Sequence, residues 1–223
     1  MTTLEPMDAF FAARTEGYDE HMLTNVQGCR EGYTLMAQRL PENTRRLLDL
    51  GCGTGLELDE IFKHFPTLSV TGIDLTRSML DKLHAKHADK HMTLICGDYF
   101  SVPFGTEAFD CAVSFETMHH FSRESKVALY TKIYDALQPD GCYIECDYMV
   151  DTQQEEDALF AENARLRAEQ GIPADAFYHF DTPCTIDGQI SMLRAAGFFS
   201  VELIFHMGGT AMLVAKKSGR DAT

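Results

Sequence analysis

Residues 47–58 read LLDLGCGTGLEL, and this stretch decides the fold class. A short apolar run, typical of a buried strand, is followed at once by Gly51, Gly53 and Gly55. Glycines directly after a strand permit a tight turn and a close approach of backbone to a ligand. The spacing differs from the dinucleotide fingerprint G-x-G-x-x-G because position 56 is leucine, and no Gly-Lys-Ser/Thr of a P-loop follows. A plain turn after a buried strand is the alternative.

Outward from this stretch, short apolar runs alternate with segments of helical period. The expected strands are RRLLDL (45–50), LSVTGIDL (68–75), MTLICGD (92–98), FDCAVSF (109–115) and CYIECDYM (142–149). Strands that alternate with helices predict an α/β fold with a parallel sheet covered on both faces. The tail, FSVELIFHMGG followed by TAMLVAKK, predicts a hairpin at Gly208-Gly209 and hence an antiparallel edge on this sheet.

No repeat or linker divides the chain, so residues 1–223 are expected to form a single domain. Within it we expect four parts: an N-terminal helical cap (1–40), a ligand-binding core (44–150), an inserted helix (151–184), and a final helix with the hairpin (185–216). The inserted helix is charged and ends at Gly171-Ile172-Pro173. It is interpreted as a lid or as the arm of a homodimer, and the plain alternative is a solvated connection.

Composition and charge exclude several classes of function. The formal net charge of -15 disfavours nucleic acid as a partner because a polyanion would be repelled. No apolar stretch approaches the ~20 residues that span a bilayer, and the N-terminus lacks the pattern of a signal peptide, so a cytoplasmic protein is expected. The seven cysteines contain no C-x-x-C pair, and no metal site is expected from their spacing or from that of the histidines.

Two further strand ends carry acidic residues. Asp74 ends the second expected strand, where a carboxylate can accept two hydrogen bonds from ribose hydroxyls. Asp98 ends the third, beside Tyr99, where it can accept the exocyclic amine of an adenine. Each aspartate alone is commonly a helix cap. Together with the glycine turn, however, they offer three successive strand ends to one nucleoside ligand.

These segments resemble a known family. LLDLGCGTGLEL, TGIDLTRSML, CGDYFSVPF, FDCAVSFETMHHF and ALQPDGCYIECD together are similar to the class I S-adenosylmethionine-dependent methyltransferases, especially the small-molecule branch typified by ubiquinone and menaquinone biosynthesis enzymes. The resemblance covers residues 44–150 closely and 185–216 through the last helix and hairpin. It implies a Rossmann-like, doubly wound seven-stranded sheet, mostly parallel with an antiparallel last strand. It also implies S-adenosyl-L-methionine as cofactor and methyl transfer to a small-molecule acceptor.

The resemblance also implies the cofactor site. Gly51, Gly53 and Gly55, with Cys52 between them, would approach the methionine part, and Asp49 would orient the loop or meet the amino group. Asp74 would hold the ribose. The remaining residues assigned to the cofactor are Leu75 and Met79 flanking the adenine, Asp98 and Tyr99 at its edge, and Phe115 beneath the sulfonium.

Methyl transfer from a sulfonium needs alignment more than a catalytic side chain. The candidates to contact the acceptor are Glu116 and His119 in FETMHHF and Tyr18 in the N-terminal helices. For each of them ordinary packing is the alternative. The competing functions are a tRNA or protein methyltransferase, and a non-catalytic protein that binds the same cofactor. A nicotinamide oxidoreductase is disfavoured by the glycine spacing.

Overall fold

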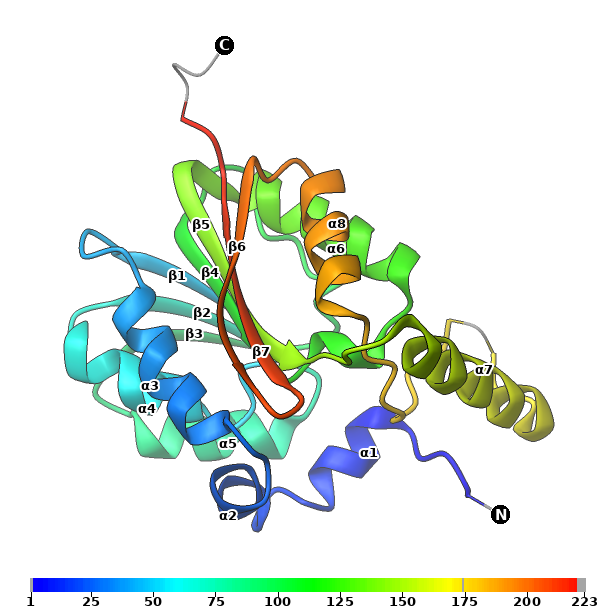
Figure 1. Cartoon of the computed structure of the whole chain (residues 1–223). Coiled ribbons are helices and arrows are strands. Elements are labelled where there is room, and N and C mark those ends of the chain that lie inside the picture. The colour runs from blue at the N-terminus through cyan, green and yellow to red at the C-terminus, as the bar shows by residue number, and fades with distance from the viewer. Residues whose placement is uncertain (1, 174, 220–223) are drawn as a thin grey trace.

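The computed structural model describes residues 2–173 and 175–219, and its core is one seven-stranded sheet. The strand order is β3-β2-β1-β4-β5-β7-β6 (Figure 1). Every neighbouring pair is parallel except the two that involve β7. The strands are β1 (Arg46–Leu50), β2 (Ser69–Asp74), β3 (His91–Cys96), β4 (Phe109–Phe115), β5 (Leu137–Tyr148), β6 (Ser200–Met207) and β7 (Thr210–Lys216). The predicted doubly wound α/β fold is therefore confirmed.

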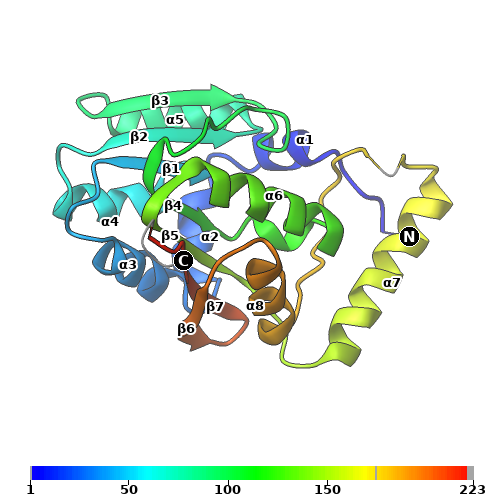
Figure 2. The ribbon, with the colours of Figure 1, turned by 90° about the horizontal axis from the view of Figure 1, so that it is seen from above.

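Helices cover both faces of this sheet, and each face has its own hydrophobic core (Figure 2). Side chains alternate along each strand, so Cys111 and Val113 of β4 enter one core while Ala112 enters the other. Burial on both faces explains why the strands are continuous apolar runs. The first core is covered by α3 (Cys29–Arg39), α4 (Leu56–His64) and α5 (Arg77–Lys86), and the second by α6 (Arg123–Ala136) and α8 (Ile186–Ala195).

The first two helices, α1 (Met7–Ala12) and α2 (Tyr18–Thr24), lie where the parallel strands end. Phe11 of α1 lines the same small space as Gly51 and Asp74. A side chain on Gly53 would meet the ring of Tyr18 at 3.9 Å. Helix α3, in contrast, packs on a face of the sheet. Only the earlier part of residues 1–40 therefore lies over the strand ends.

The insertion between β5 and α8 carries α7 (Gln153–Gln170), which projects from the body of the molecule (Figures 1 and 2). Its N-terminus is capped by the side chain of Thr152, and it ends at Gly171, whose φ is 64°. Residues 176–185, here called the return strap, then pair with the N-terminal segment: Met7 N donates to Phe177 O at 3.1 Å, and His179 N donates to Glu5 O at 2.9 Å. Within residues 2–173 and 175–219, no helix is both long and apolar enough to cross a membrane.

The predicted hairpin at Gly208-Gly209 is present, but its antiparallel strand is not at the edge of the sheet. Strand β7 lies between β5 and β6, and β6 forms the edge. The burial of the two strands explains the order: Ala211, Met212 and Leu213 of β7 are fully buried, whereas Leu203 of β6 is 44% exposed. The more uniformly apolar strand of the hairpin thus occupies the interior position.

Candidate active site

The loop between β1 and α4 has the backbone that its glycines predict. Gly51, Gly53 and Gly55 have φ values of 69°, 45° and 74°, in the left-handed region that favours glycine. A Cβ on Gly51 would lie 2.5 Å from Oγ1 of Thr117, and one on Gly55 would collide with the side chain of Leu83. The loop therefore has no room for side chains at these two positions.

The two strand-end aspartates are held by the turns that follow them. Asp74 accepts hydrogen bonds from Gly53 N at 2.9 Å and from Thr76 N at 2.7 Å. Asp98 accepts from Phe100 N at 2.8 Å and from Ser101 Oγ at 2.7 Å. Each carboxylate oxygen has two lone pairs, so both aspartates can accept further hydrogen bonds. Because the order is β3-β2-β1, these acids and the glycine loop lie at three neighbouring strand ends.

A small space, here called the strand-end crevice, follows these ends and has a volume of about 50 Å³. Phe11 of α1 and Phe177 of the return strap contribute to its wall. The other residues that line it include Gly51, Asp74, Leu75, Asp98, Tyr99, Thr117 and His120. Sites for small molecules are usually of about 300–1,000 Å³, so a nucleoside would fit here only after part of the wall moves.

Two buried carboxyls lie side by side behind the glycine loop. Asp49 of β1 is fully buried and Glu57 of α4 is 5% exposed. Among the described residues, neither oxygen of Asp49 has a hydrogen-bond partner. Burial raises the pKa of Asp49 to about 7, and burial together with the charge of Asp49 raises the pKa of Glu57 well above its usual value. A cation bound beside this pair would stabilise both ionised carboxylates.

A much larger space, the main cavity, has a volume of about 850 Å³ and adjoins the crevice. Phe11 and His120 line both spaces. The wall comes from five separate segments: α1 to α2, the residues after β4, Tyr148 at the end of β5, the return strap, and the β6–β7 turn. Its size is ordinary for a cavity that holds a small molecule.

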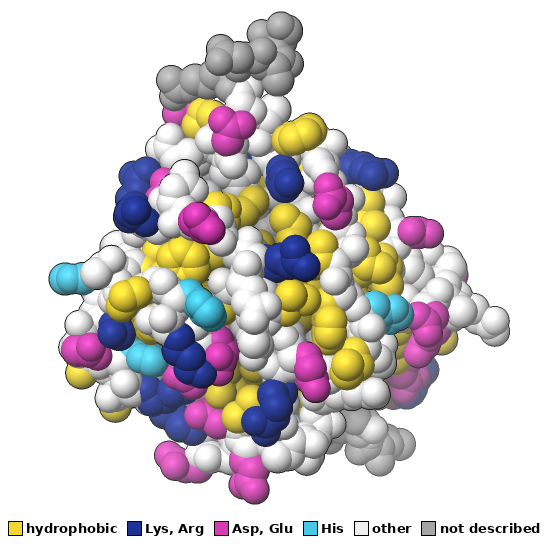
Figure 3. All heavy atoms as spheres, turned by 60° about the vertical axis from the view of Figure 1, so that its left-hand side comes forward, with side chains coloured by type: hydrophobic (Ala, Val, Ile, Leu, Met, Phe, Trp, Pro, Cys, Tyr) yellow, Lys and Arg dark blue, Asp and Glu magenta, His cyan; other side chains and the backbone are white. Residues whose placement is uncertain are grey.

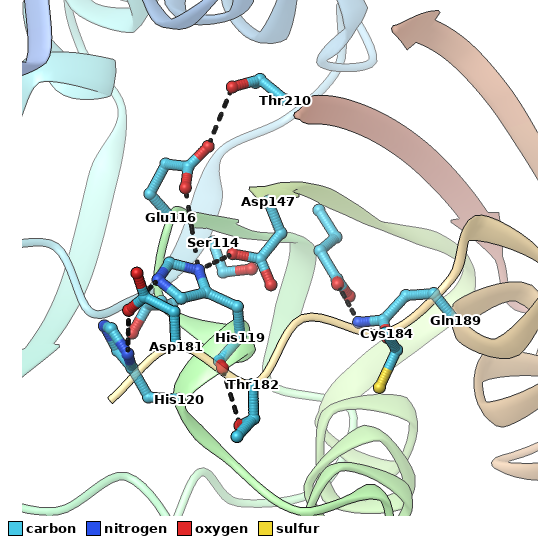
Figure 4. A network of polar contacts seen from close by, with 12 residues as sticks. Ser114, Glu116, His119, His120, Asp147, Asp181, Thr182, Cys184, Gln189 and Thr210 are labelled. Carbon is cyan, nitrogen blue, oxygen red and sulfur yellow. Dashed lines mark hydrogen bonds and ion pairs between the residues drawn. The ribbon is translucent and has the colours of Figure 1, made fainter. Parts of the chain in front are cut away.

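A histidine–carboxylate cluster lies at one wall of the main cavity, and all of its members except Asp147 line that cavity. Its members are Glu116, His119, His120, Asp147, His179 and Asp181. Figure 4 shows Glu116, His119, His120, Asp147 and Asp181. His119 lies in the 3-10 helix η1 (Met118–His120), and its Nδ1 donates to Oδ1 of Asp147 at 2.7 Å. Oε2 of Glu116 lies 3.7 Å from the same Nδ1, and Oε1 of Glu116 accepts from Oγ1 of Thr210 at 3.2 Å. The buried Asp147 therefore fixes the orientation of the His119 ring.

Asp181 of the return strap is the centre of the rest of the cluster. Its Oδ1 lies 3.5 Å from Nε2 of His119, 3.4 Å from Nδ1 of His120 and 3.7 Å from Nε2 of His179. Two sets of three side chains bring their ligand atoms within 4.8 Å of one another: His119 with His120 and Asp181, and Glu116 with His119 and Asp147. Spacing in the sequence did not indicate either set, because the members come from three separate segments of the chain.

The charges of this cluster shift its pKa values in opposite directions. Burial alone would lower the pKa of His119, but Asp147, Glu116 and Asp181 raise it to about 9. Burial and the charge of His119 lower the pKa of His120 to about 4. Burial raises the pKa of Glu116 to about 7, whereas the nearby imidazoles hold the pKa of Asp181 below its usual range against the effect of burial. The cluster thus favours bound protons or other cations.

Comparison with known proteins agrees with this architecture. Residues 47–141 match the family model of the methyltransferase domain. Over these residues the chain is therefore similar to methyltransferase domains. The chain is 31% identical over 108 residues to 24-methylenesterol C-methyltransferase 2 of Oryza sativa subsp. japonica, a match that covers 47% of this chain but only 29% of that relative.

Two further similarities extend over more of the chain. Carboxy-S-adenosyl-L-methionine synthase of Haemophilus ducreyi is 25% identical over 197 residues, or 82% of this chain and 80% of the synthase. The structure of human N-acetylserotonin methyltransferase in complex with SAM superposes with a TM-score of 0.63 at 17% identity, covering 94% of this chain and 55% of that one. At that identity the second similarity concerns the fold.

The structure brings together five of the eleven residues that the sequence assigned to the cofactor. Gly51, Asp74, Leu75, Asp98 and Tyr99 line the strand-end crevice. Gly53 and Gly55 belong to the glycine loop and Asp49 lies behind it, but none of the three lines the crevice. The side chain of Cys52 is buried and lies against Gly72 of β2, so only the backbone of this cysteine could meet a ligand.

Met79 and Phe115 line neither space. Met79 of α5 is 2% exposed. Phe115 stacks on Tyr33 of α3, with ring centroids 3.9 Å apart. The alternation of β4 explains the second placement, because Phe115 shares its face with Cys111 and Val113, which point into the core under α3.

The candidates for the acceptor side all reach the main cavity. Tyr18, Glu116 and His119 are among its lining residues. Sequence reasoning missed Phe11, Thr117 and Glu57. Phe11 resembled ordinary packing of an amphipathic helix, and Glu57 resembled an acidic residue in the first turn of a helix. No local signal distinguished them.

Proposed function

We propose that this protein transfers a methyl group from S-adenosyl-L-methionine to a small molecule held in the main cavity. The observation that carries the proposal is the contact between the two spaces. The strand-end crevice follows the glycine loop, Asp74 and Asp98, and it meets the main cavity at Phe11 and His120. A donor seated along the strand ends would therefore present its reactive group to an acceptor in the cavity.

The residues present fit the cofactor. Gly51 leaves a cradle that a Cβ would fill, and Asp74 and Asp98 keep lone pairs for a ribose and an adenine amine. Asp49 is buried without a hydrogen-bond partner among the described residues, which suits the ammonium of the methionine end. We add Glu57 to this set because its carboxyl adjoins that of Asp49. Because the crevice is small, binding requires movement of Phe11 or Phe177, which belong to α1 and the return strap.

On the acceptor side, Tyr18, Glu116 and His119 would contact the substrate. The bound cofactor supplies an activated methyl group, so the main task of these residues is to hold the acceptor's reacting atom in line with it. The cavity combines the aromatic rings of Phe10, Phe11 and Tyr18 with the polar cluster. An acceptor with an apolar body and a polar reacting group matches this wall.

The surface supports a small molecule rather than a nucleic acid. The formal net charge is -15. On the face shown in Figure 3, Lys and Arg side chains stand singly or in small groups among Asp and Glu. Such a surface gives a phosphate backbone little attraction. A tRNA or protein acceptor is the outcome that would contradict this part of the proposal.

The long alignment with carboxy-S-adenosyl-L-methionine synthase suggests a second candidate, in which the cofactor itself is modified. The cavity wall speaks against it, because Glu116, Asp147 and Asp181 would repel a donor that carries carboxylates. Mass spectrometry of the cofactor after turnover separates the two reactions, since only methyl transfer yields S-adenosylhomocysteine.

Isothermal titration with S-adenosylmethionine and S-adenosylhomocysteine tests the cofactor assignment. We expect micromolar binding that Asp74→Asn weakens at least about tenfold, through the loss of about 1.4 kcal/mol or more of charge-assisted hydrogen bonding to the ribose. The exposed Asp89 provides the control, and Asp89→Asn should bind as the wild type does. A folded wild-type protein that binds neither compound would contradict the proposal.

A further inference from the structure

The geometry around Asp181 matches that of a metal site. A first-row divalent ion holds nitrogen and oxygen ligands at about 2.0–2.2 Å, so its neighbouring ligand atoms lie about 3.0–3.5 Å apart. Nε2 of His119 and Nδ1 of His120 lie 3.5 and 3.4 Å from Oδ1 of Asp181. These separations are longer than a hydrogen bond and correspond to the edges of a coordination polyhedron.

Two of these three atoms lack a hydrogen bond. Among the described residues, Nδ1 of His120 and Oδ1 of Asp181 are buried without a hydrogen-bond partner, and so is Nε2 of His120. The side chain of His120 is only 3% exposed. Buried polar atoms are nearly always satisfied by protein, water or an ion, so Nδ1 of His120 and Oδ1 of Asp181, which lie 3.4 Å apart, are suited to a common partner.

The surroundings prepare His119 and Asp181 for this role. Nδ1 of His119 donates to Asp147, which leaves Nε2 directed at Asp181 as the ring nitrogen that can bind a metal ion in place of a proton. Carboxylates that orient a ligating histidine in this way are common around metals. Thr182 donates both its N–H, at 2.6 Å, and its Oγ1, at 2.9 Å, to the carbonyl of His119, and so fixes the return strap beside η1 (Figure 4).

We propose that His119 Nε2, His120 Nδ1 and Asp181 Oδ1 bind a divalent first-row transition metal such as Zn²⁺ or Fe²⁺. Two histidines and one carboxylate, with open positions on one side, are a ligand set that these ions use. The alternative set of Glu116, His119 and Asp147 is less suitable, because Nδ1 of His119 is already engaged by Asp147 at 2.7 Å. This proposal replaces the expectation of no metal drawn from sequence spacing.

The open side of the metal faces the main cavity, which all three ligands line. If the proposed function holds, the acceptor is then a hydroxyl compound whose oxygen coordinates the ion. Coordination lowers the pKa of a hydroxyl and so supplies the nucleophile at neutral pH. The hydroxyl proton passes to solvent, the new O–CH₃ bond forms as the S–CH₃ bond breaks, and the sulfonium becomes the thioether of S-adenosylhomocysteine.

Metal titration of the full chain, without an affinity tag and stripped with EDTA, tests the site. We expect Co²⁺ to bind at one equivalent per chain with a visible absorption band, and Zn²⁺ to displace it. His120→Ala and Asp181→Asn should each abolish saturable binding. Asp147→Asn, which alters only the orienting residue, should weaken binding by about 10–100-fold. His206→Ala is the matched control, because Nε2 of His206 lies 3.8 Å from Asp151 and, among the described residues, His206 belongs to no set of three metal-binding groups.

A folded wild-type chain that shows no saturable Co²⁺ or Zn²⁺ binding would overturn the proposal. So would binding that His120→Ala and Asp181→Asn leave intact while circular dichroism shows both variants folded. Titration of the stripped protein with S-adenosylmethionine keeps the two proposals apart. If the protein binds S-adenosylmethionine but no metal, the metal proposal is wrong and the proposed methyl transfer is unaffected. If it binds the metal but not S-adenosylmethionine, the proposed methyl transfer is wrong and the metal site is unaffected.

Discussion

The strand-end crevice and the main cavity are neighbours, but they are built in different ways. The glycine loop and the two aspartates of the crevice each lie at the end of their own strand: the glycine loop follows β1, Asp74 ends β2 and Asp98 follows β3. The wall of the main cavity combines five segments that are distant in the sequence. These polar groups of the crevice are therefore encoded locally, whereas the cavity, like the part of the crevice wall formed by Phe11 and Phe177, exists only once the chain has folded.

The difference extends to electrostatics. The aspartates of the crevice are held by backbone N–H groups of their own turns. The histidines and carboxylates of the cavity are held by one another and by the return strap. Substitution of the aspartates should therefore affect cofactor binding, whereas loss of a hydrogen bond between the strap and His119 should affect mainly the cavity.

The largest effect should come from Gly51→Val. The new side chain would need the left-handed φ of 69° and would collide with Thr117, whose Oγ1 is 2.5 Å from the Cβ position. We expect the free energy of unfolding to fall by roughly 2–4 kcal/mol and S-adenosylmethionine binding to be lost. Urea denaturation and calorimetric titration measure the two effects.

Gly17→Ala is the control for this change, since a Cβ there meets nothing within 4 Å. It should leave stability nearly unchanged. Retention of wild-type cofactor affinity in Gly51→Val would show that the loop does not seat the cofactor.

Asp49→Asn should change stability and binding in opposite directions. The pKa of Asp49 is about 7 in the folded protein against 3.8 in the unfolded chain, so the folded state binds the proton more tightly. The contribution of Asp49 to stability is then greatest below pH 3.8 and falls as the pH rises toward 7. The variant lacks this loss, and at pH 8 it should be more stable by roughly 1–3 kcal/mol, while its affinity for S-adenosylmethionine drops.

Urea melts across the range from pH 4 to 8 check this prediction for the wild type and the variant. The exposed Asp89 again serves as the control, and Asp89→Asn should follow the wild-type curve. If Asp49→Asn has the same pH dependence as the wild type, Asp49 does not carry the buried charge.

The smallest effect should come from Thr182→Val, which removes one of two hydrogen bonds between the return strap and the carbonyl of His119. We expect the free energy of unfolding to fall by about 1 kcal/mol, with cofactor affinity within about twofold of the wild type. Thr131→Val is the control, because its hydroxyl also donates to a carbonyl but is exposed. A large loss of cofactor affinity in Thr182→Val would show that the crevice depends on the strap.

The same contrast explains what the sequence could predict. Gly51, Asp74 and Asp98 follow strands that apolar runs identify, and the edge of a parallel sheet brings such ends together. Phe115 was assigned to the cofactor from its position after β4, but the period of two along that strand directs it to Tyr33. Taking this alternation into account would have placed it in the core.

The cluster around Asp181 could not be predicted in the same way. His119 and His120 were visible as a pair, but nothing near them in the sequence specifies a carboxylate 61 residues away from His120, at position 181. Its arrival depends on the path of the return strap and on the hydrogen bonds from Thr182 to His119. The order of β6 and β7 could not be predicted for a related reason. The sequence of a hairpin specifies how its two strands pair with each other, but not which of the two pairs with β5.

The pairing of the N-terminal segment with the return strap has a consequence for biosynthesis. Residues 5–7 reach their partners at 177–179 only after most of the chain has left the ribosome. Strand β5 likewise can pair with its antiparallel neighbour β7 only after the ribosome has passed Thr210, where β7 begins. During translation the glycine loop and its strands can form early, while α1 remains without its partner. The nascent chain should therefore form the strand ends that carry the glycine loop, Asp74 and Asp98 first, and complete the wall of the main cavity last.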